Sequence, residues 1–167
     1  MRILFLGANG FIGSRVLARL LADGHEVRAA VRDPARLRRR FPPIEAVRAD
    51  LNALVDPEGW RPLLRGVEAV VNCAGALQSG RGQSLTAIHE RAPAALYQAC
   101  VGTGCRRIIH LSAISADPSA GTEYARTKHA AERRLMALDL DWVILRPSLV
   151  YGPGSHGGTS LLRALAA

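Results

Sequence analysis

The sequence predicts an α/β fold in which a doubly wound parallel sheet carries helices on both faces. Short apolar segments alternate with longer amphipathic segments along the chain, which is the pattern of repeated strand–helix units. The apolar segments are nearly continuous, as expected for parallel strands that are buried on both sides. The first of them leads through a glycine-rich turn into a helical pattern.

Six strands and their connecting helices follow from these patterns. Strands are predicted over residues 2–6, 25–33, 44–51, 67–75, 105–113 and 140–147. Helices are predicted over residues 14–24, 34–41, 84–104 and 122–138, with a short helix or turn over 57–66, a glycine-rich loop over 151–158 and a short helix over 159–167. Right-handed crossovers between parallel strands then give the order 3-2-1-4-5-6.

Glycine and proline mark several element ends. Gly24 suits the end of the first helix, because glycine adopts a left-handed conformation without strain. Pro34 suits the first position of the second helix. Pro93 lies inside the long helix over 84–104 and predicts a kink there. One face of this helix is apolar and consists of Leu85, Ile88, Ala92, Ala95, Leu96 and Ala99.

Length and composition limit the class of protein. A chain of 167 residues with 49% hydrophobic residues fits one globular domain with its own core. No apolar run reaches the roughly 18–20 residues of a membrane span, and the N-terminus lacks the features of a signal peptide. We therefore expect a cytoplasmic protein without a membrane span.

The cysteines and histidines give no metal-binding pattern. Cys73, Cys100 and Cys105 are odd in number and contain no CxxC motif, which favours reduced core thiols over a disulfide or a metal site. The five histidines lack paired ligand spacing. No bound metal is expected.

The net charge is +8, and residues 28–40 carry six arginines against one aspartate. Such a run could bind nucleic acid, form a solvated helix face, or supply one or two arginines to a phosphate. The position of Arg32 at the end of the second strand favours the phosphate role for part of the run. A nucleic acid partner is therefore not expected.

Gly7, Gly10 and Gly13 form a GxxGxxG pattern between the first strand and the first helix. Glycine tolerates the tight turn and lets backbone N–H groups approach a pyrophosphate. The helix N-terminus adds about half a positive charge. Since a strand precedes the pattern and a helix follows it, the sequence predicts a dinucleotide site at this turn.

Lys128 is the only lysine in the chain and follows Tyr124 by four residues; the other 21 basic residues counted are arginines. Residues four apart lie on one helix face, and an ammonium near a phenol lowers the pKa of the phenol. Tyr124 could then exchange a proton with a substrate hydroxyl or carbonyl. The rigid fork of arginine is a poor substitute for a compact ammonium.

The GANGFIG segment resembles the short-chain dehydrogenase/reductase superfamily, in particular its extended and atypical branches. Asp50-Leu51, NCAGA at 72–76, the YxxxK motif at 124–128 and LRPSLVYGPG at 145–154 extend the resemblance over essentially the whole chain. The resemblance implies a Rossmann fold, a single NAD(P)-binding domain over 1–167, and oxidoreductase or epimerase/dehydratase activity. The most similar group is related to the accessory NAD(P)-binding subunit of respiratory complex I.

The motifs and the resemblance together give a set of candidate site residues. Tyr124, Lys128 and Ser112 are the candidate catalytic residues, and the resemblance gives Lys128 a second role at the nicotinamide ribose. The candidate cofactor-binding residues are Gly7, Asn9, Gly10, Phe11, Ile12, Gly13, Arg32, Asp50, Leu51, Ala74, Gly75, Ala76, Tyr124, Lys128 and Pro147.

One position departs from the superfamily pattern. Where a catalytic serine or threonine usually follows the fifth strand, this chain has Ala113. Ser112 or Ser115 could supply the hydroxyl instead. If neither does, the chain is a non-catalytic structural or regulatory module that binds NADP(H), which is the alternative to an enzyme.

Two histidines fall in predicted elements. His89 lies where extended members often have asparagine, and it could face the cofactor through a water or be an ordinary helix residue. His110, in the fifth strand, is expected to be a hydrogen-bonded core histidine.

The second strand also suggests which dinucleotide binds. Arg32 lies near the expected 2′-phosphate, which a guanidinium binds in a bidentate way, and Arg36 could assist. Asp33 could instead hold the ribose hydroxyls, as in NAD sites. NADP(H) is predicted as the preferred cofactor, with NAD(H) as the alternative.

Extended members are about twice as long as one domain, so we expect a truncated chain that lacks most of the C-terminal substrate-binding portion. The substrate is an unidentified small molecule. A homodimer could form through the two long helices, which many relatives use in this way.

Overall fold

The computed structural model describes residues 1–80 and 82–152 and contains the six predicted strands. In chain order the strands are β1 (Arg2–Leu6), β2 (Glu26–Val31), β3 (Glu45–Arg48), β4 (Ala69–Asn72), β5 (Arg107–Leu111) and β6 (Asp141–Leu145). The helices are α1 (Phe11–Ala22), α2 (Pro34–Arg40), α3 (Pro57–Trp60), the 3₁₀ helix η1 (Arg61–Leu64), the π-helix η2 (Thr86–Arg91), α4 (Ala92–Cys100) and α5 (Glu123–Met136). The predicted helix over 159–167 and most of the loop over 151–158 lie outside the described residues.

All strand pairs are parallel, and the sheet has the predicted order β3-β2-β1-β4-β5-β6. β1 lies in the middle, with Leu6 paired to Ala30 on one side and to Asn72 on the other. The chain therefore reverses its direction of winding beside β1. In a doubly wound sheet, the crevice at such a switch point is where ligands bind.

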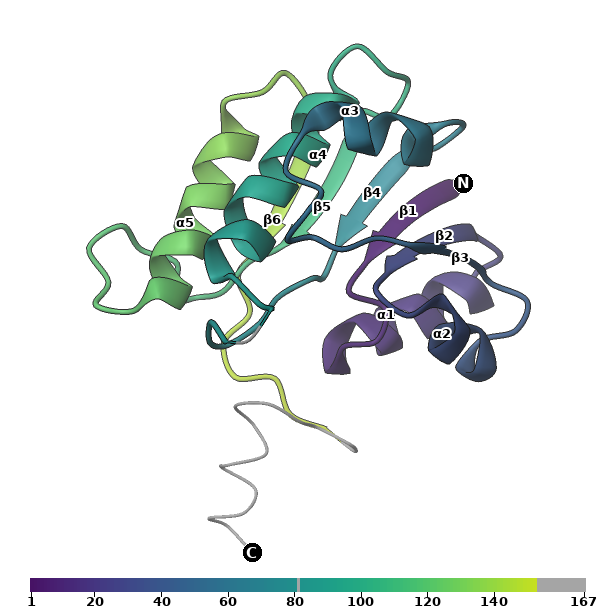
Figure 1. Ribbon diagram of the computed structural model, residues 1–167, viewed down its shortest axis with the longest axis horizontal. Helices are drawn as coiled ribbons and strands as arrows, with labels where there is room; N and C mark the ends of the chain where they lie inside the picture. The colour runs from purple at the N-terminus through teal and green to yellow at the C-terminus, as the bar shows by residue number, and fades with distance from the viewer. Residues whose placement is uncertain (81, 153–167) are drawn as a thin grey trace, which may run out of the picture.

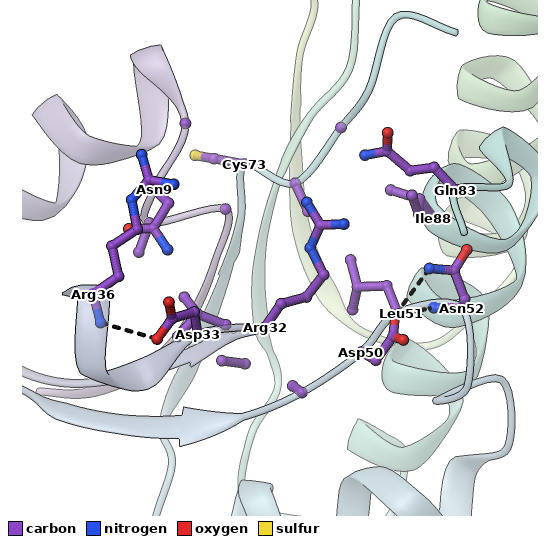
Figure 2. A pocket seen from close by; sticks show the side chains of 18 residues that line it. Asn9, Arg32, Asp33, Arg36, Asp50, Leu51, Asn52, Cys73, Gln83 and Ile88 are labelled. Carbon is purple, nitrogen blue, oxygen red and sulfur yellow. Dashed lines mark hydrogen bonds between the residues drawn. The ribbon is translucent and has the colours of Figure 1, made fainter. Parts of the chain in front are cut away.

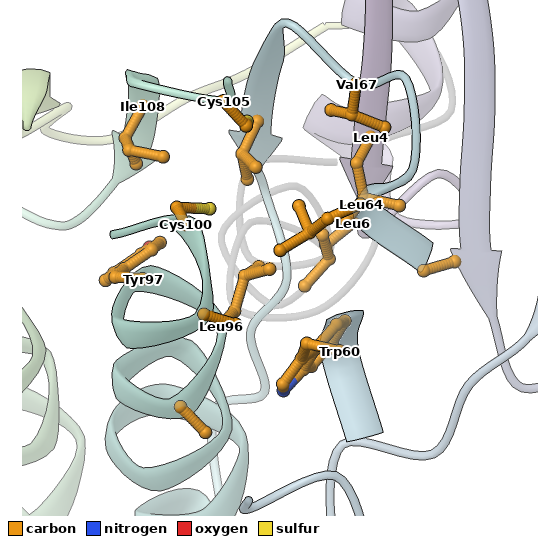
Figure 3. Packing of buried hydrophobic residues seen from close by; sticks show 14 of the residues in the cluster. Leu4, Leu6, Trp60, Leu64, Val67, Leu96, Tyr97, Cys100, Cys105 and Ile108 are labelled. Atoms are coloured by element: carbon orange, nitrogen blue, oxygen red, sulfur yellow. The ribbon is translucent and has the colours of Figure 1, made fainter. Parts of the chain in front are cut away.

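Helices cover both faces of the sheet, as predicted (Figure 1). α1 and α2 lie on one face, and α3, α4 and α5 lie on the other. Each face has its own core: Phe5 and Leu17 belong to the α1 side, whereas Leu4 and Leu96 belong to the α4 side. Figure 3 shows the α4 side, where Trp60 and Tyr97 pack beside Leu6 and Cys100. This alternation along β1 explains why the strand is apolar at every position from Ile3 to Leu6.

Two helices differ most from their predicted bounds. α1 begins at Phe11, three residues before the predicted start, so Gly13 is a helical residue. The predicted helix over 84–104 is a π-helix from Thr86 to Arg91 and an α-helix only from Ala92 to Cys100. The N–H of Ala92 bonds to the carbonyl of Ala87, five residues back. The wider π-turn ends just before Pro93, whose missing N–H cannot continue an α-helical ladder.

The cysteines lie within this framework as free thiols. Cys100 and Cys105 are buried core residues, as predicted, but Cys73 is half-buried in the loop after β4. Among residues 1–80 and 82–152, no helix combines the length and hydropathy that crossing a membrane requires.

Candidate functional site

A cleft runs along the carboxyl ends of the central strands. It consists of two adjoining pockets, a first pocket of about 410 Å³ over β1, β2 and β3 and a second pocket of about 730 Å³ over β1, β4 and β5. The two pockets share a wall, which consists of Gly10, Cys73, Ala74, Gly75 and Gln83. The cleft thus lies at the switch point beside β1.

The glycine turn after β1 packs directly against the loop after β4. Gly7 has a φ of +84°, and a Cβ there would lie 2.5 Å from the carbonyl carbon and oxygen of Cys73. A Cβ on Gly13 would collide with the Gly7 carbonyl. Gly10, the residue that precedes α1, has no side chain and makes no side-chain cap. This close-packed turn fits a pyrophosphate bound through backbone N–H groups.

Two arginines line the first pocket, Arg32 just after β2 and Arg36 on α2. Figure 2 shows Arg32 extending toward the side of Gln83 and Ile88, whereas Arg36 lies on the opposite side, beside Asn9. Asp33 lines the same pocket, and its Oδ1 accepts the N–H of Arg36 at 3.0 Å and caps α2. The geometry therefore offers guanidinium groups to an anion at this end of the cleft.

Asp50 and Leu51 form another part of the first pocket's wall. The Asp50 carboxylate accepts hydrogen bonds from the backbone N–H of Asn52 at 3.0 Å and from its side-chain amide at 2.9 Å. These bonds lower the pKa of Asp50, and the nearby charges of Arg32 and Arg48 lower it further. The carboxylate is therefore ionised and held in one orientation.

Lys128 lies at the inner wall of the second pocket and is only 4% exposed. Its Nζ donates a hydrogen bond to the carbonyl of Leu111 at 2.9 Å. A Cβ on Gly75 would lie 3.5 Å from the same nitrogen. The lysine therefore contacts both the end of β5 and the loop after β4, and it is not a solvated helix residue.

Burial lowers the pKa of Lys128 from 10.5 to about 8. The unfolded chain then binds more protons than the folded chain between these two values, so stability rises with pH in that window. We expect the free energy of unfolding of the wild type to gain on the order of 3 kcal/mol relative to Lys128→Met between pH 8 and 10.5. Urea unfolding of both proteins across this range measures the difference. A constant difference would contradict a buried ammonium.

Tyr124 lines the second pocket with Lys128, but its pKa moves in the direction opposite to the prediction. Burial raises the pKa of the Tyr124 phenol above its usual value. The spacing of four residues does bring both side chains to one pocket; desolvation of the phenolate nevertheless dominates the shift. In this state Tyr124 is a protonated phenol, which suits a proton donor better than a base.

The structure distinguishes between the two candidate serines. Ser112 is buried and lines the second pocket, and its Oγ has no partner among the described residues. Ser115 is exposed and is not among the residues that line either pocket. Ala113 also lines the second pocket, where it presents a methyl group. Ser112 is thus the hydroxyl available beside Tyr124.

The two helix and strand histidines have direct hydrogen-bond partners. His89 Nε2 lies 3.0 Å from the backbone N of Ala76, without an intervening water, and its Nδ1 lies 3.0 Å from Thr127 Oγ1. His110 Nδ1 lies 2.7 Å from the hydroxyl of Tyr97. His110 Nε2 is buried without a partner among the described residues, so the prediction of a fully bonded core histidine is wrong for that nitrogen.

An ion pair holds the segment after β6 against α5. Arg146 makes a bidentate pair with Glu132, whose side chain is fully buried. The carbonyl of the next residue, Pro147, accepts the N–H of Ile114 at 3.0 Å. Pro147 is therefore fixed where it lines the second pocket.

The candidate residues from the sequence come together in this cleft. Each of them, from Gly7 to Pro147, lines the first or the second pocket. Their cofactor-binding and catalytic roles stay predictions. Several other lining residues were missed. Asn52, Leu77, Gln78, Gln83 and Ile88 belong to no motif, whereas Ser148, Leu149 and Val150 belong to the LRPSLVYGPG segment but were not assigned to the site. Asn52 and Ser148 directly follow predicted strands, whereas Gln83 and Ile88 lie far from any strand end and gave no such signal.

Comparison with known proteins identifies relatives of this chain. A family model described as NAD(P)H-binding matches residues 7–163. A ceramide reductase of Caulobacter vibrioides is 30% identical over 98% of this chain and 51% of its own length. Subunit 9 of the NADH dehydrogenase 1 alpha subcomplex of Rattus norvegicus is 26% identical over 87% of this chain and 40% of its own length.

The solved structures give the same family likeness. MoeE5, determined with UDP-glucuronic acid and NAD, superposes with a TM-score of 0.78 at 27% identity, covering 98% of this chain and 60% of MoeE5. The chain spans about half the length of the curated relatives it matches first, 51% and 52%.

Proposed function

Because the chain belongs to the NAD(P)H-binding family, we propose that it binds NADP(H) in the cleft and acts as the cofactor half of a reductase. The observation that carries this proposal is the pairing of a buried lysine and a protonated tyrosine in the pocket that adjoins the glycine turn. The nicotinamide, when bound, supplies the hydride. The chain's own residues bind the cofactor, orient it and deliver the proton.

The glycine turn and the α1 N-terminus are the proposed pyrophosphate site. Asp50 and Leu51 would border the adenine end, and Ala74, Gly75, Ala76 and Pro147 would line the nicotinamide end of the cleft. Lys128, with one hydrogen bond to Leu111, keeps further N–H donors for the ribose hydroxyls.

Tyr124 is the proposed proton donor to a carbonyl oxygen of the substrate. Its raised pKa keeps the proton on the phenol until the carbonyl gains negative charge. The ammonium of Lys128 then stabilises the phenolate that forms. Ser112 lines the same pocket, and its buried Oγ, which has no partner among the described residues, would donate a second hydrogen bond to that oxygen.

Arg32 supports NADP(H) rather than NAD(H), since a guanidinium in the first pocket suits a 2′-phosphate. We expect Arg32→Ala to weaken NADPH binding about 10- to 100-fold and to leave NADH binding within about threefold. Calorimetric titration with each cofactor measures both constants. Arg39→Ala is the matched control, because Arg39 is exposed on α2 and does not line the pocket.

The titration also tests the function itself. Binding of neither cofactor by the wild type would contradict the proposed function. Tighter binding of NADH than of NADPH would retain the site but reject Arg32 as a phosphate ligand.

A second candidate is a non-catalytic module that binds NADP(H). The methyl group of Ala113 in the wall beside Tyr124 favours it, and so does the similarity to a respiratory complex subunit. Tight NADPH binding without oxidation of NADPH by any of a panel of aliphatic ketones and 3-oxo acids would support the module over the reductase.

A further inference from the structure

His89 lies at the centre of the contact between the cofactor-facing loop after β4 and helix α5. It is 1% exposed, and its two ring nitrogens bond to different elements: Nε2 to Ala76 in the loop and Nδ1 to Thr127 on α5. We propose that His89 is a positioning residue that sets the separation between this loop and Tyr124 and Lys128. This role rests on the proposed function of the cleft.

The hydrogen-bond partners determine which ring nitrogen carries the proton. Thr127 Oγ1 lies 2.8 Å from the carbonyl of Glu123 and 3.1 Å from that of Tyr124, so its hydroxyl proton is donated to the α5 backbone. Its oxygen therefore accepts from His89 Nδ1–H. The N–H of Ala76 can only donate, so His89 Nε2 accepts. The ring is thus the neutral tautomer protonated at Nδ1.

The surroundings keep this imidazole neutral. Burial lowers the pKa of His89 to about 3, and the charge of Lys128 on α5 acts in the same direction. The other titratable groups near it are Tyr124, in ring contact from α5, and His110 on β5, whose own pKa is also about 3. A second proton on the ring would remove the acceptor for Ala76. His89 is therefore a fixed hydrogen-bonding group and not an acid or a base.

The ring also contacts the residues that it would position. Its edge-to-face contact with the Tyr124 ring has a centroid distance of 5.3 Å and an interplanar angle of 88°. Gly75 lies between His89 and Lys128: a Cβ on Gly75 would be 3.4 Å from His89 Nε2 and 3.5 Å from Lys128 Nζ. The imidazole thus contacts both the loop, through Ala76, and the ring of Tyr124. Gly75 of the same loop lies close to Lys128.

The local helix geometry supports a special role for this position. His89 lies within the π-helix Thr86–Arg91, and single π-turns inside helices occur frequently at functional sites. The π-turn is costly compared with an α-helical turn, so its presence beside the cleft needs a compensating contact. The paired hydrogen bonds of His89 to Ala76 and Thr127 provide one.

Matched variants separate the two hydrogen bonds. In His89→Gln the side-chain oxygen reaches about as far as Nε2 and can accept from Ala76. In His89→Asn the amide nitrogen corresponds to Nδ1 and can donate to Thr127, but the bond to Ala76 is lost. His89→Ala loses both. We expect NADPH binding to weaken about tenfold in His89→Ala and His89→Asn and to stay within about threefold of the wild type in His89→Gln.

Two measurements accompany the binding constants. Thermal unfolding tests whether the losses of NADPH binding follow only from lower stability. Equal losses of NADPH binding in all three variants, in step with their melting temperatures, would overturn the positioning role. Long-range ¹H–¹⁵N spectra of the wild type should show His89 protonated at Nδ1 and unchanged between about pH 5 and 8. Protonation at Nε2, or titration within that range, would overturn the proposed bridge.

The spectra are recorded without cofactor, so they test the hydrogen bonds of His89 independently of whether the cleft binds NADP(H). A wild type that binds neither NADPH nor NADH would contradict the proposed function and, with it, the positioning role. The Nδ1–H signature would then still establish the bridge between the loop and α5 as a structural contact.

Discussion

Replacing Gly13 by alanine is expected to abolish cofactor binding and to lower the free energy of unfolding by roughly 1–3 kcal/mol or more. The new Cβ would collide with the carbonyl oxygen of Gly7 and lie 2.8 Å from its carbonyl carbon. Neither atom can move away, because Gly7 itself abuts the backbone of Cys73 and has a positive φ. The turn can admit a methyl group only by opening, and an open turn loses the approach of its N–H groups to a pyrophosphate.

Gly104→Ala is the control for this substitution. Gly104 has an ordinary φ, and a Cβ there would meet nothing within 4 Å, so its stability should stay within about 0.5 kcal/mol of the wild type. Urea unfolding and NADPH titration of both variants measure the effects on stability and on cofactor binding. A Gly13→Ala variant as stable as Gly104→Ala would mean that the turn is looser than the structure describes.

The strand order and many members of the cleft could be predicted from local patterns. Continuous apolar segments fix each strand, the glycine turn fixes the first crossover, and parallel strands bring their carboxyl ends to one edge. Arg32, Asp50 and Gly75 all follow strand ends, so a correct topology is enough to gather them. Lys128 was assigned to the site in another way, from its four-residue spacing to Tyr124 and from the YxxxK motif.

The contacts of His89 could not be predicted, because they join three segments that no short motif connects. Its position in the helix is visible in the sequence, but its bonds depend on the π-turn before Pro93 and on the rotamer of Thr127. The direction of the pKa shift of Tyr124 could not be predicted from the sequence either. Spacing predicts that Tyr124 and Lys128 meet in one pocket, whereas the balance between charge and desolvation depends on how deeply the phenol is buried.

Tyr124→Phe is expected to reduce turnover about 10²- to 10⁴-fold while leaving NADPH binding within about threefold. The substitution removes the phenolic proton but keeps the ring, and with it the edge-to-face contact with His89. Loss of the proton donor therefore affects only the step in which the substrate oxygen gains its proton. The rate of NADPH oxidation with a ketone that the wild type reduces, together with calorimetric binding, measures the two effects separately.

Tyr151→Phe makes the same chemical change at a tyrosine that is 83% exposed, and it should leave both turnover and NADPH binding unchanged.

Ser112→Ala tests the neighbouring hydroxyl. If Ser112 shares the substrate oxygen with Tyr124, its loss lowers turnover without changing NADPH binding. If Ser112→Ala has no effect while Tyr124→Phe does, the reductase works with a single donor, and the methyl group of Ala113 is simply part of the wall. Undiminished turnover in Tyr124→Phe would remove Tyr124 from the mechanism.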